Sequence, residues 1–469
     1  MLPPADLAKQ IADLQLSINL MWTLLAAFLV MFMQAGFALV ETGLTRAKNA
    51  AHTMAMNILV YAIGIIGFWA VGFGLQMGGT GPMGTFANDA TLSHELTVHL
   101  FGQEWGLLGW SGFFLSPAVF TPAVAATFLF QMVFMDTAAT IPTGALAERW
   151  KFTAFVVFSF LVVTLIYPIY ANWVWGGGFL SQLGHNFHLG HGHVDFAGSS
   201  VVHMTGGVLA LVGAKMLGPR KGKFGKDGKP RPIPGHSVPM VVLGTVILAF
   251  GWFGFNAGST LAGTDVQIAI IATNTMLASA AGGLSAYLLL EFKFGKPDVT
   301  LVCNGLLAGL VAITAPCAFV GAGEAVLIGA AAGLIAIWAT FFVERRLRVD
   351  DPVGAIAVHG FNGAFGVLCV GLFANGTYGD GLNGVDGKVI GLFHGGGFGQ
   401  LAAQSIGVLV NVLFVGAMGF GSMKLVGKLV GNRSTEEDEV AGLDLGEIGV
   451  TGYGVDGNHA FPPEIAGQG

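Results

Sequence analysis

The stretches DFAGSSVVHMTGG at residues 195–207 and DPVGAIAVHGFNG at residues 351–363 share the pattern Asp-x-x-Gly-x-x-x-Val-His-x-x-x-Gly. Each stretch lies in or beside a long apolar run, which predicts that His203 and His359 lie inside a membrane. Ionisable side chains are rare in membrane-spanning segments, and those that occur there usually serve a function. A histidine at the same position of a repeated pattern is therefore the first candidate for a functional residue.

The composition is that of a membrane protein with many spans. Of 469 residues, 54% are hydrophobic and 10% are charged, whereas soluble domains carry about 25% charged residues. The 73 glycines are typical of helices that pack closely in a membrane. The net charge of -6 does not indicate a nucleic-acid partner. The three cysteines lie in apolar segments, at spacings that indicate no disulfide framework: Cys303, Cys317 and Cys369.

Apolar runs of about 20 residues predict transmembrane helices, and this chain has eleven of them, which predicts an all-α membrane protein. The predicted spans are residues 18–43, 52–76, 117–147, 152–173, 197–218, 238–258, 265–291, 299–317, 321–343, 353–374 and 399–427. We therefore assign residues 1–430 to a transmembrane domain and residues 431–469 to a C-terminal tail. The N-terminal segment lacks the basic start and short apolar core of a removable signal peptide.

The basic residues predict the orientation in the cell membrane. Of the 21 Lys and Arg residues, 19 lie in one set of alternate connections, and only Lys9 and Lys388 lie in the other set. Connections rich in Lys and Arg remain in the cytoplasm. We therefore expect an outside N-terminus and a cytoplasmic C-terminal tail.

The two motifs also predict an inverted repeat. The span after Asp195 is the fifth and starts outside, whereas the span after Asp351 is the tenth and starts inside. This predicts two five-helix repeats of opposite orientation with one extra helix, an arrangement that places a substrate path near the midplane. A rise of 1.5 Å per residue puts each histidine about 12 Å from its aspartate, at a depth where the two can meet.

We interpret Asp195 and Asp351 as helix caps, because a carboxylate at a helix start accepts backbone N–H groups and complements the helix dipole. A direct electrostatic role is the alternative for Asp195. A pore role is expected for the two motif histidines. A metal site is the alternative, but no Cys or carboxylate lies beside them at ligand spacing, so neither a metal nor a cofactor is predicted.

Other ionisable residues receive structural interpretations. Asp136, within the third span, is interpreted as a buried, hydrogen-bonded structural acid, with a place in the conduction path as the alternative. Glu41 lies near the inner end of the first span, with Arg46 and Lys48 as nearby partners. Four histidines before the first motif are interpreted as part of a polar extracellular loop, with adventitious metal binding as the alternative: His185, His188, His191 and His193.

The chain strongly resembles the ammonium transporter family (Amt, related to Mep and Rh proteins) over roughly residues 18–445. The resemblance is carried by five segments: GALAER at 144–149, VWGGG at 174–178, DFAGSSVVH at 195–203, GWFGFNAGS at 251–259, and the stretch from RVDDP at 348–352 to VHG at 358–360. It implies a transporter rather than an enzyme.

The resemblance also implies residue roles. Phe134, Trp175 and Ser259 would hold an ammonium ion at an external recruitment site, and Phe134 and Phe255 would form a gate below it. The two motif histidines would line an apolar pore, and Asp195 would stabilise the recruitment region without touching the ion. Because a bare cation is costly to bury, we expect deprotonation near the gate and passage of ammonia, with separate proton transfer left open.

The family is typically a homotrimer in the lipid bilayer, with one pore per subunit, and its cytoplasmic face can dock PII-type signalling proteins. The alternative function is an ammonium sensor with little flux that signals through its tail. The chain departs from the family at Asp136, where a small or apolar residue is usual, and in its longer, histidine-rich loop before Asp195. It also has Ile448, Gly449 and Val450 where a His-Gly-Glu element is common, which makes tail regulation a weaker expectation than transport.

Overall fold

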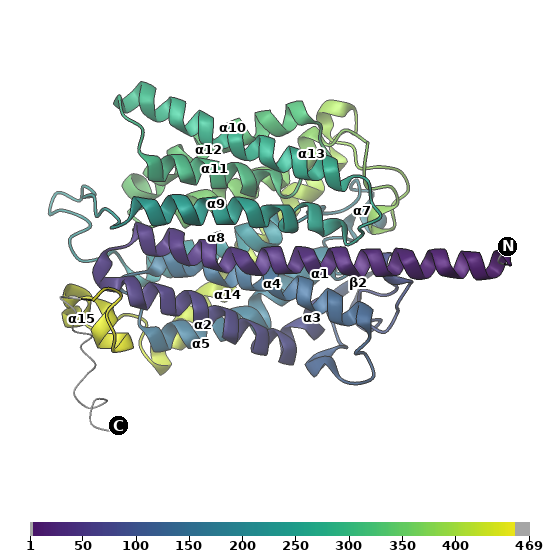
Figure 1. The fold of residues 1–469 in the computed structure, drawn as a ribbon, viewed down its shortest axis with the longest axis horizontal. Helices are drawn as coiled ribbons and strands as arrows, with labels where there is room; N and C mark the ends of the chain where they lie inside the picture. Colours follow the sequence, from purple (N-terminus) through teal and green to yellow (C-terminus); the bar gives the residue numbers. More distant parts are fainter. Residues whose placement is uncertain (1–2, 455–469) are drawn as a thin grey trace.

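Long apolar helices run across the molecule and end at two polar faces (Figure 1). This computed structural model describes residues 3–454. Within that range ten helices are long and apolar enough to span a membrane. They comprise α1 (Pro4–Leu44), α2 (Ala50–Gly67) continued by a π-helical turn (Phe68–Gly72) and α3 (Phe73–Met77), α4 (Pro122–Leu146), α5 (Phe152–Leu161) continued by a π-helical turn (Val162–Ile166) and α6 (Tyr167–Trp175), η6 (Ser199–Met204) with α8 (Thr205–Leu217), α9 (Val238–Phe255), α10 (Ile268–Phe294), α12 (Ala322–Phe342) with η8 (Val343–Leu347), η9 (Ile356–Phe361) with α13 (Asn362–Phe373), and α14 (Gly399–Leu429).

The predicted all-α membrane fold is confirmed, and the eighth span is shorter than expected. That span is α11 (Val299–Ile313), whose 15 residues extend about 22 Å at 1.5 Å per residue. Turns follow it up to Phe319, because Pro316 has no N–H group and the N–H of Ala315 is donated to Ser199 Oγ instead. The predicted domain boundary at residue 430 lies beside the end of α14, and residues 455–469 of the predicted tail lie outside the described residues.

Side-chain caps explain where several spans begin. Thr121, Ser237 and Asp298 each accept a backbone N–H from the first turn of α4, α9 and α11, respectively. Such caps satisfy N–H groups that have no partner within the helix. Proline follows the cap of α4 as Pro122, a position where its fixed backbone angle favours helix initiation.

Short elements build the two polar faces. The face from which α1 projects, here the N-terminal face, carries an antiparallel hairpin of β1 (Glu95–Leu100) and β2 (Gln103–Gly109), α7 (Leu183–Phe187) and the connection 374–398. The opposite, C-terminal face carries α15 (Glu436–Ala441) and η12 (Asp444–Ile448). The remaining short turns are η1 (Ala47–Asn49), η3 (Gly84–Phe86), η4 (Phe113–Leu115), η7 (Ala257–Thr260), η10 (Leu382–Gly384) and η11 (Leu392–His394).

The first helix of each half packs against the other. Helices α1 and α9 are in extensive contact and run together in Figure 1. The approach depends on glycine, since a Cβ on Gly244 would lie 2.7 Å from the carbonyl oxygen of Gly36. Small residues permit this close backbone packing in membranes.

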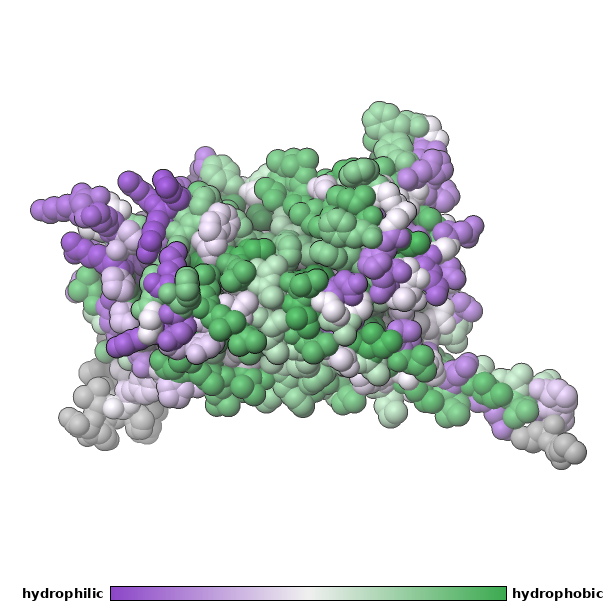
Figure 2. All heavy atoms as spheres, turned by 90° about the horizontal axis from the view of Figure 1, so that it is seen from above, coloured by the Kyte–Doolittle hydropathy of each residue, from purple (hydrophilic) through white to green (hydrophobic). Residues whose placement is uncertain are grey.

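Figure 2 shows an apolar band between the two polar faces on the side of the bundle that it presents. Large apolar side chains point outward on several spans, including Ile58 on α2, Phe250 on α9, Leu288 on α10 and Leu413 on α14. A bilayer is the environment that accommodates such a surface, because its hydrocarbon core has the same polarity.

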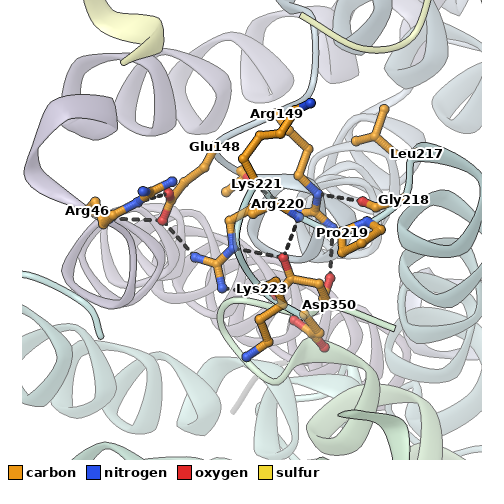
Figure 3. Close-up of polar contacts among 12 residues, drawn as sticks. Arg46, Glu148, Arg149, Leu217, Gly218, Pro219, Arg220, Lys221, Lys223 and Asp350 are labelled. Atoms are coloured by element: carbon orange, nitrogen blue, oxygen red, sulfur yellow. Dashed lines mark hydrogen bonds and ion pairs between the residues drawn. The ribbon is translucent and has the colours of Figure 1, made fainter. Parts of the chain in front are cut away.

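Buried ion pairs join the connections on the C-terminal face (Figure 3). Glu148, after α4, pairs with Arg46 and, at 2.8 Å, with Arg220. Arg220 also pairs with Asp350 at 2.9 Å, and Arg149 donates to the carbonyl oxygen of Asp350. Burial alone raises the pKa of the Asp350 carboxyl, but the guanidinium groups of Arg149 and Arg220 outweigh it and hold that pKa below its usual range.

The expectation that Glu41 uses the basic residues after α1 is wrong. Its carboxylate accepts hydrogen bonds from Asn57 Nδ2 at 2.7 Å and from Thr143 Oγ1 at 2.7 and 2.9 Å. Arg46 instead pairs with Glu148, and Lys48 donates to the carbonyl oxygen of Glu439 in the tail. Glu41 is buried within the bundle, where neutral side chains of α2 and α4 are its neighbours.

Candidate functional site

The repeated aspartate begins a π-helical turn in each half of the molecule. Asp195 accepts the four backbone N–H groups of residues 198–201, at 2.7 to 3.0 Å, before η6. Asp351 accepts those of residues 353, 354 and 356, at 2.8 to 3.2 Å, before η9. These N–H groups have no partner within the turn, so each carboxylate holds the turn that carries its histidine.

Motif glycines let the two turns approach one another. Gly198 and Gly354 have φ angles of 115° and 78°, a region of backbone space that only glycine occupies without strain. A Cβ on Gly207 would lie 2.2 Å from the backbone nitrogen of Gly360. The two halves therefore cross at backbone contact distance beside the histidines.

His203 and His359 meet at this crossing. Their Nδ1 atoms lie 3.2 Å apart, and their ring centroids are separated by 5.2 Å. His203 also stacks against Trp252 and Phe255, with ring centroids 5.2 Å away in each case. Its Nε2 atom is buried, and within residues 3–454 it has no hydrogen-bond partner. The pair therefore lies in buried, aromatic surroundings, with Nε2 of His203 left without a partner in the described residues.

Aromatic rings continue from the histidines toward the N-terminal face. Phe255 stacks on Phe134 with centroids 4.2 Å apart, and both side chains are buried. Trp175 meets Phe134 edge-to-face at 6.0 Å. The indole Nε1 of Trp175 donates to the carbonyl oxygen of Asp195 at 2.7 Å, which connects this aromatic column to the first motif.

A cavity of about 210 Å³, here called the vestibule, lies at the end of the column. Phe134, Trp175 and Ser259 all line it. Ser259 Oγ donates its hydrogen to the carbonyl oxygen of Phe255 at 2.7 Å, so the hydroxyl oxygen retains lone pairs as an acceptor. Stacked Phe134 and Phe255 close the inner end, which separates the vestibule from the histidine pair.

Asp136 faces away from this column. It lies two residues after Phe134 on α4, which turns it about 200° around the helix, and its Oδ1 lies 3.6 Å from where a Cβ on Gly64 of α2 would be. Met135 also lies against Gly64. The expected hydrogen bonding of Asp136 is wrong for Oδ1, which is buried and has no partner within residues 3–454. Glycine at the facing position supplies no donor.

Two of the four loop histidines are buried, which corrects their interpretation as polar loop residues. His191 is held by the carbonyl oxygen of Gly387, and His193 is fully buried. Nε2 of His193 lies 2.9 Å from Ser200 Oγ, and Ser200 donates to Asp195 Oδ2 at 2.7 Å. Since the serine hydrogen is used, the imidazole must donate to the serine. Burial lowers the pKa of His193 to about 4, so the ring is neutral at neutral pH.

Sequence reasoning missed the role of His193 in supporting Asp195. The His-x-Asp spacing directly before the motif was the available signal. That spacing does not show that His193 packs against α14. Gly407 of α14 leaves room for the imidazole ring, because a Cβ at this position would lie 2.0 Å from Nδ1 of His193.

The bundle of apolar helices contains two motif turns of opposite direction, and an aromatic column leads from their histidines to the vestibule. This architecture is that of a polytopic membrane transport protein. Residues 21–453 match the model of the Ammonium Transporter Family. The chain belongs to this family: it is an ammonium transporter and not an enzyme.

Relatives from two archaea align over nearly the whole chain. Ammonium transporter Amt2 of Archaeoglobus fulgidus is 44% identical over 94% of this chain and 89% of its own length. Ammonium transporter Amt1 of Haloferax mediterranei is 38% identical over 93% of this chain and 79% of its own.

Solved structures share the fold. A protein described as a Sensor Amt Protein superposes with a TM-score of 0.80 at 36% identity, covering 93% of this chain and 99% of that one. The crystal structure of Candida albicans Mep2 gives 0.74 at 26% identity, with 90% and 87% covered.

Proposed function

We propose that this transporter recruits an ammonium ion in the vestibule, removes one proton, and conducts ammonia past His203 and His359. One observation carries the proposal: the two imidazoles lie with Nδ1 atoms 3.2 Å apart, directly beyond the stacked rings that close the vestibule. The chemistry of each step follows from the residues that the substrate would meet.

Recruitment depends on the aromatic faces of Phe134 and Trp175 and on the hydroxyl oxygen of Ser259. A compact cation near an aromatic face gains about 0.5 to 2 kcal/mol, with more at dry sites. The serine oxygen accepts one N–H hydrogen bond, which replaces part of the hydration shell.

The ammonium ion must lose its charge at the gate formed by Phe134 and Phe255. Beyond Phe134 and Phe255 the surroundings are aromatic, and an unpaired ion there would cost several kcal/mol. The ammonium ion avoids this cost when it gives up one proton and continues as neutral ammonia. A potassium ion has no neutral form, so the same barrier excludes it.

The histidine pair can form a hydrogen bond with ammonia in either of its tautomers. When the hydrogen between the rings belongs to His203, its Nε2 is a bare acceptor for an N–H of ammonia. When that hydrogen belongs to His359, Nε2 of His203 is protonated and donates to the ammonia nitrogen. Either tautomer therefore satisfies a molecule that both donates and accepts. Separate transfer of the proton along the pair is part of the proposal.

Asp195 and Asp351 act indirectly in this mechanism. Each carboxylate holds the turn that aims a histidine, and Asp195 adds negative potential near the vestibule. We propose that Asp136 lies outside the conduction path, because its Oδ1 faces Gly64 of α2.

We further propose that the N-terminal face lies outside the cell and the C-terminal face in the cytoplasm. The distribution of Lys and Arg supports this orientation. The exposed apolar band is consistent with a homotrimer in lipid. The C-terminal face, with its basic connections and the described part of the tail, is the surface that a PII-type protein would bind.

Reconstituted vesicles test the mechanism. Charge movement and internal pH are recorded when ammonium is added to wild type and to His203→Ala, His359→Ala and His99→Ala, the last an exposed histidine of β1. Loss of a buried hydrogen-bonding partner corresponds to about tenfold or more in flux, so both pore variants should fall by this amount while His99→Ala stays near wild type. Equal flux in wild type and His203→Ala would contradict the proposal.

A sensor with little flux is the second candidate, and the similarity to the Sensor Amt Protein motivates it. In this chain, Asp444 accepts the backbone N–H of His52, and Glu439 binds the basic connection after α8, so the tail contacts the ends of the spans. Ammonium binding measured by calorimetry without vesicle flux would favour sensing. Saturable flux favours transport.

A further inference from the structure

A second cavity adjoins the vestibule. Its volume is about 240 Å³, and it shares Trp175, Phe196 and Ser259 with the vestibule. We call it the side chamber. Its wall is completed by residues of two connections on the N-terminal face, including Phe319 after α11 and Tyr378 after α13. Tyr378 is only partly buried, so the chamber reaches the outer surface of that face.

Aromatic rings enclose the side chamber from several directions. Phe196 meets Phe319 at 5.9 Å and 87°, and meets Tyr378 at 5.8 Å and 80°. Phe319 and Tyr378 lie 5.8 Å apart at 64°. With Trp175 these rings form a cage of four aromatic side chains. Cages of this kind bind methylated ammonium groups through cation–π attraction.

The chamber also has a negative charge at its wall. Asp195 lines it, and no Lys or Arg forms an ion pair with Asp195 in the part of the chain that the structure describes. The helix start next to Asp195 carries about half a positive charge, which leaves a net negative potential. His193 also lines the chamber, and as a neutral ring it does not offset this charge. Asp265, which accepts the hydroxyl of Tyr378 at 2.8 Å, adds a second carboxylate nearby.

The hydrogen bonding of Asp195 decides which cation the chamber prefers. Its two oxygens already accept four backbone N–H groups and the hydroxyl of Ser200. An ion rich in N–H groups would lose hydration there and regain few hydrogen bonds. A fully methylated, quaternary ammonium cation has no N–H groups and needs no hydrogen bonds, because its charge is spread over methyl groups that pack against rings.

We propose that the side chamber is a binding site for small quaternary ammonium cations, with methyl groups packed against Trp175, Phe196, Phe319 and Tyr378 and the charge directed toward Asp195. The site adjoins the vestibule and shares Trp175 with it. Its occupant therefore contacts a ring that the proposed recruitment site also uses. The binding itself does not depend on the mechanism of conduction.

Calorimetric titration of the purified full chain with tetramethylammonium chloride tests this assignment, with sodium chloride at equal ionic strength as the salt control. Tyr378→Leu removes one ring that lines only the chamber and should weaken binding about tenfold. Tyr378→Phe keeps the ring and should bind within about twofold of wild type. Thermal unfolding of each variant in detergent confirms that it is folded before titration.

Phe134→Leu changes a ring that lines only the vestibule, and its affinity for tetramethylammonium should match that of wild type. Loss of binding in Phe134→Leu with retention in Tyr378→Leu would place the cation in the vestibule and overturn the proposal. Equal affinity of wild type and Tyr378→Leu, or failure of wild type to bind, would also overturn it. His203→Ala should lose ammonium flux yet still bind tetramethylammonium, which separates this proposal from the conduction mechanism.

Discussion

Asp195 and Asp136 are both buried carboxyls, but their surroundings differ completely. Asp195 accepts five hydrogen bonds, and its removal would leave backbone N–H groups of η6 without partners. Oδ1 of Asp136 has no partner in the described residues and faces a glycine. A buried polar atom without a partner costs about 1 to 3 kcal/mol. At the residue scale, then, the first aspartate stabilises its element and the second destabilises its own.

Replacement of Asp136 by alanine should therefore stabilise the protein. The expected gain is about 1 to 3 kcal/mol from the removed carboxyl, reduced by a small cavity term, and thermal unfolding in detergent measures it. Thr137→Ala is the matched control, since Thr137 Oγ1 donates to the carbonyl oxygen of Val133 and its truncation should not stabilise. The pH dependence of ammonium uptake should be unchanged in Asp136→Ala. A shifted pH profile would return Asp136 to the conduction path.

At the scale of elements, the histidine-bearing turns show where sequence patterns stop being informative. The repeated motif and the capping chemistry of aspartate predicted that each histidine lies in a helical segment that follows a capping carboxylate, and the structure has this arrangement. The turns are π-helical over Ser199–Met204 and Ile356–Phe361, and apolar periodicity carries no signal for that. Each carboxylate accepts several successive backbone N–H groups, and this favours the wider π-helical turn. Turns of this kind occur often at functional sites.

The β1–β2 hairpin was not predicted, because its alternating pattern is short and lies in a connection between two strong spans. It brings Glu95 against α6, where Asn172 Nδ2 lies 3.3 Å from its Oε2. Oε1 of Glu95 is buried without a partner in the described residues. Burial raises the pKa of Glu95 to about 7, so near neutral pH this carboxyl is half protonated.

The stability contributed by this hairpin should depend on pH. In the unfolded chain the Glu95 carboxyl loses its proton near its ordinary pKa of about 4.3, whereas in the folded protein it keeps the proton up to about pH 7. The folded state binds more protons in that window, so stability falls as pH rises through it. Glu95→Gln should therefore raise the melting temperature at pH 8 and leave it nearly unchanged below the unfolded pKa.

Asp89, in the same connection, provides a control of opposite sign. Burial raises the pKa of Asp89, but the hydrogen bonds from Thr91 and Thr121 together outweigh it and lower that pKa. Its charged form is stabilising, so Asp89→Asn should lower the melting temperature at pH 8. Equal melting temperatures of Glu95→Gln and wild type at pH 8 would show that the Glu95 carboxyl is not desolvated.

At the scale of the whole molecule, the crossing of two inverted halves was predictable because a repeated motif and an odd number of spans are both visible in the sequence. The side chamber was not predictable. Phe319 and Tyr378 lie in connections without periodic pattern, and they approach Phe196 only when those connections fold over the first motif. The ion-pair cluster on the C-terminal face was predictable in part. The positive-inside rule placed its basic residues on one face, but their acidic partners, such as Glu148 and Asp350, could be identified only from the structure.

That cluster should hold the ends of the two halves together. Arg220, from the connection between the halves, pairs with Glu148 of the first and Asp350 of the second, and all three side chains are buried. Breaking a buried pair by removing one partner costs about 3 to 5 kcal/mol, because the remaining charge is left uncompensated. Arg220→Met should therefore lower the melting temperature substantially at neutral pH, as measured by thermal unfolding in detergent.

The pH dependence distinguishes this effect from lost packing. Arg149 and Arg220 hold the pKa of Asp350 low, so its stabilising charge is present above the unfolded pKa and is lost as pH falls through the folded pKa. The deficit of Arg220→Met should consequently shrink as the pH approaches the range in which the freed carboxyls protonate. Glu436→Gln breaks the exposed Lys221–Glu436 pair and should leave the melting temperature unchanged at every pH. A deficit in Arg220→Met that is constant with pH would assign the loss to packing of the arginine side chain rather than to charge pairing across the halves.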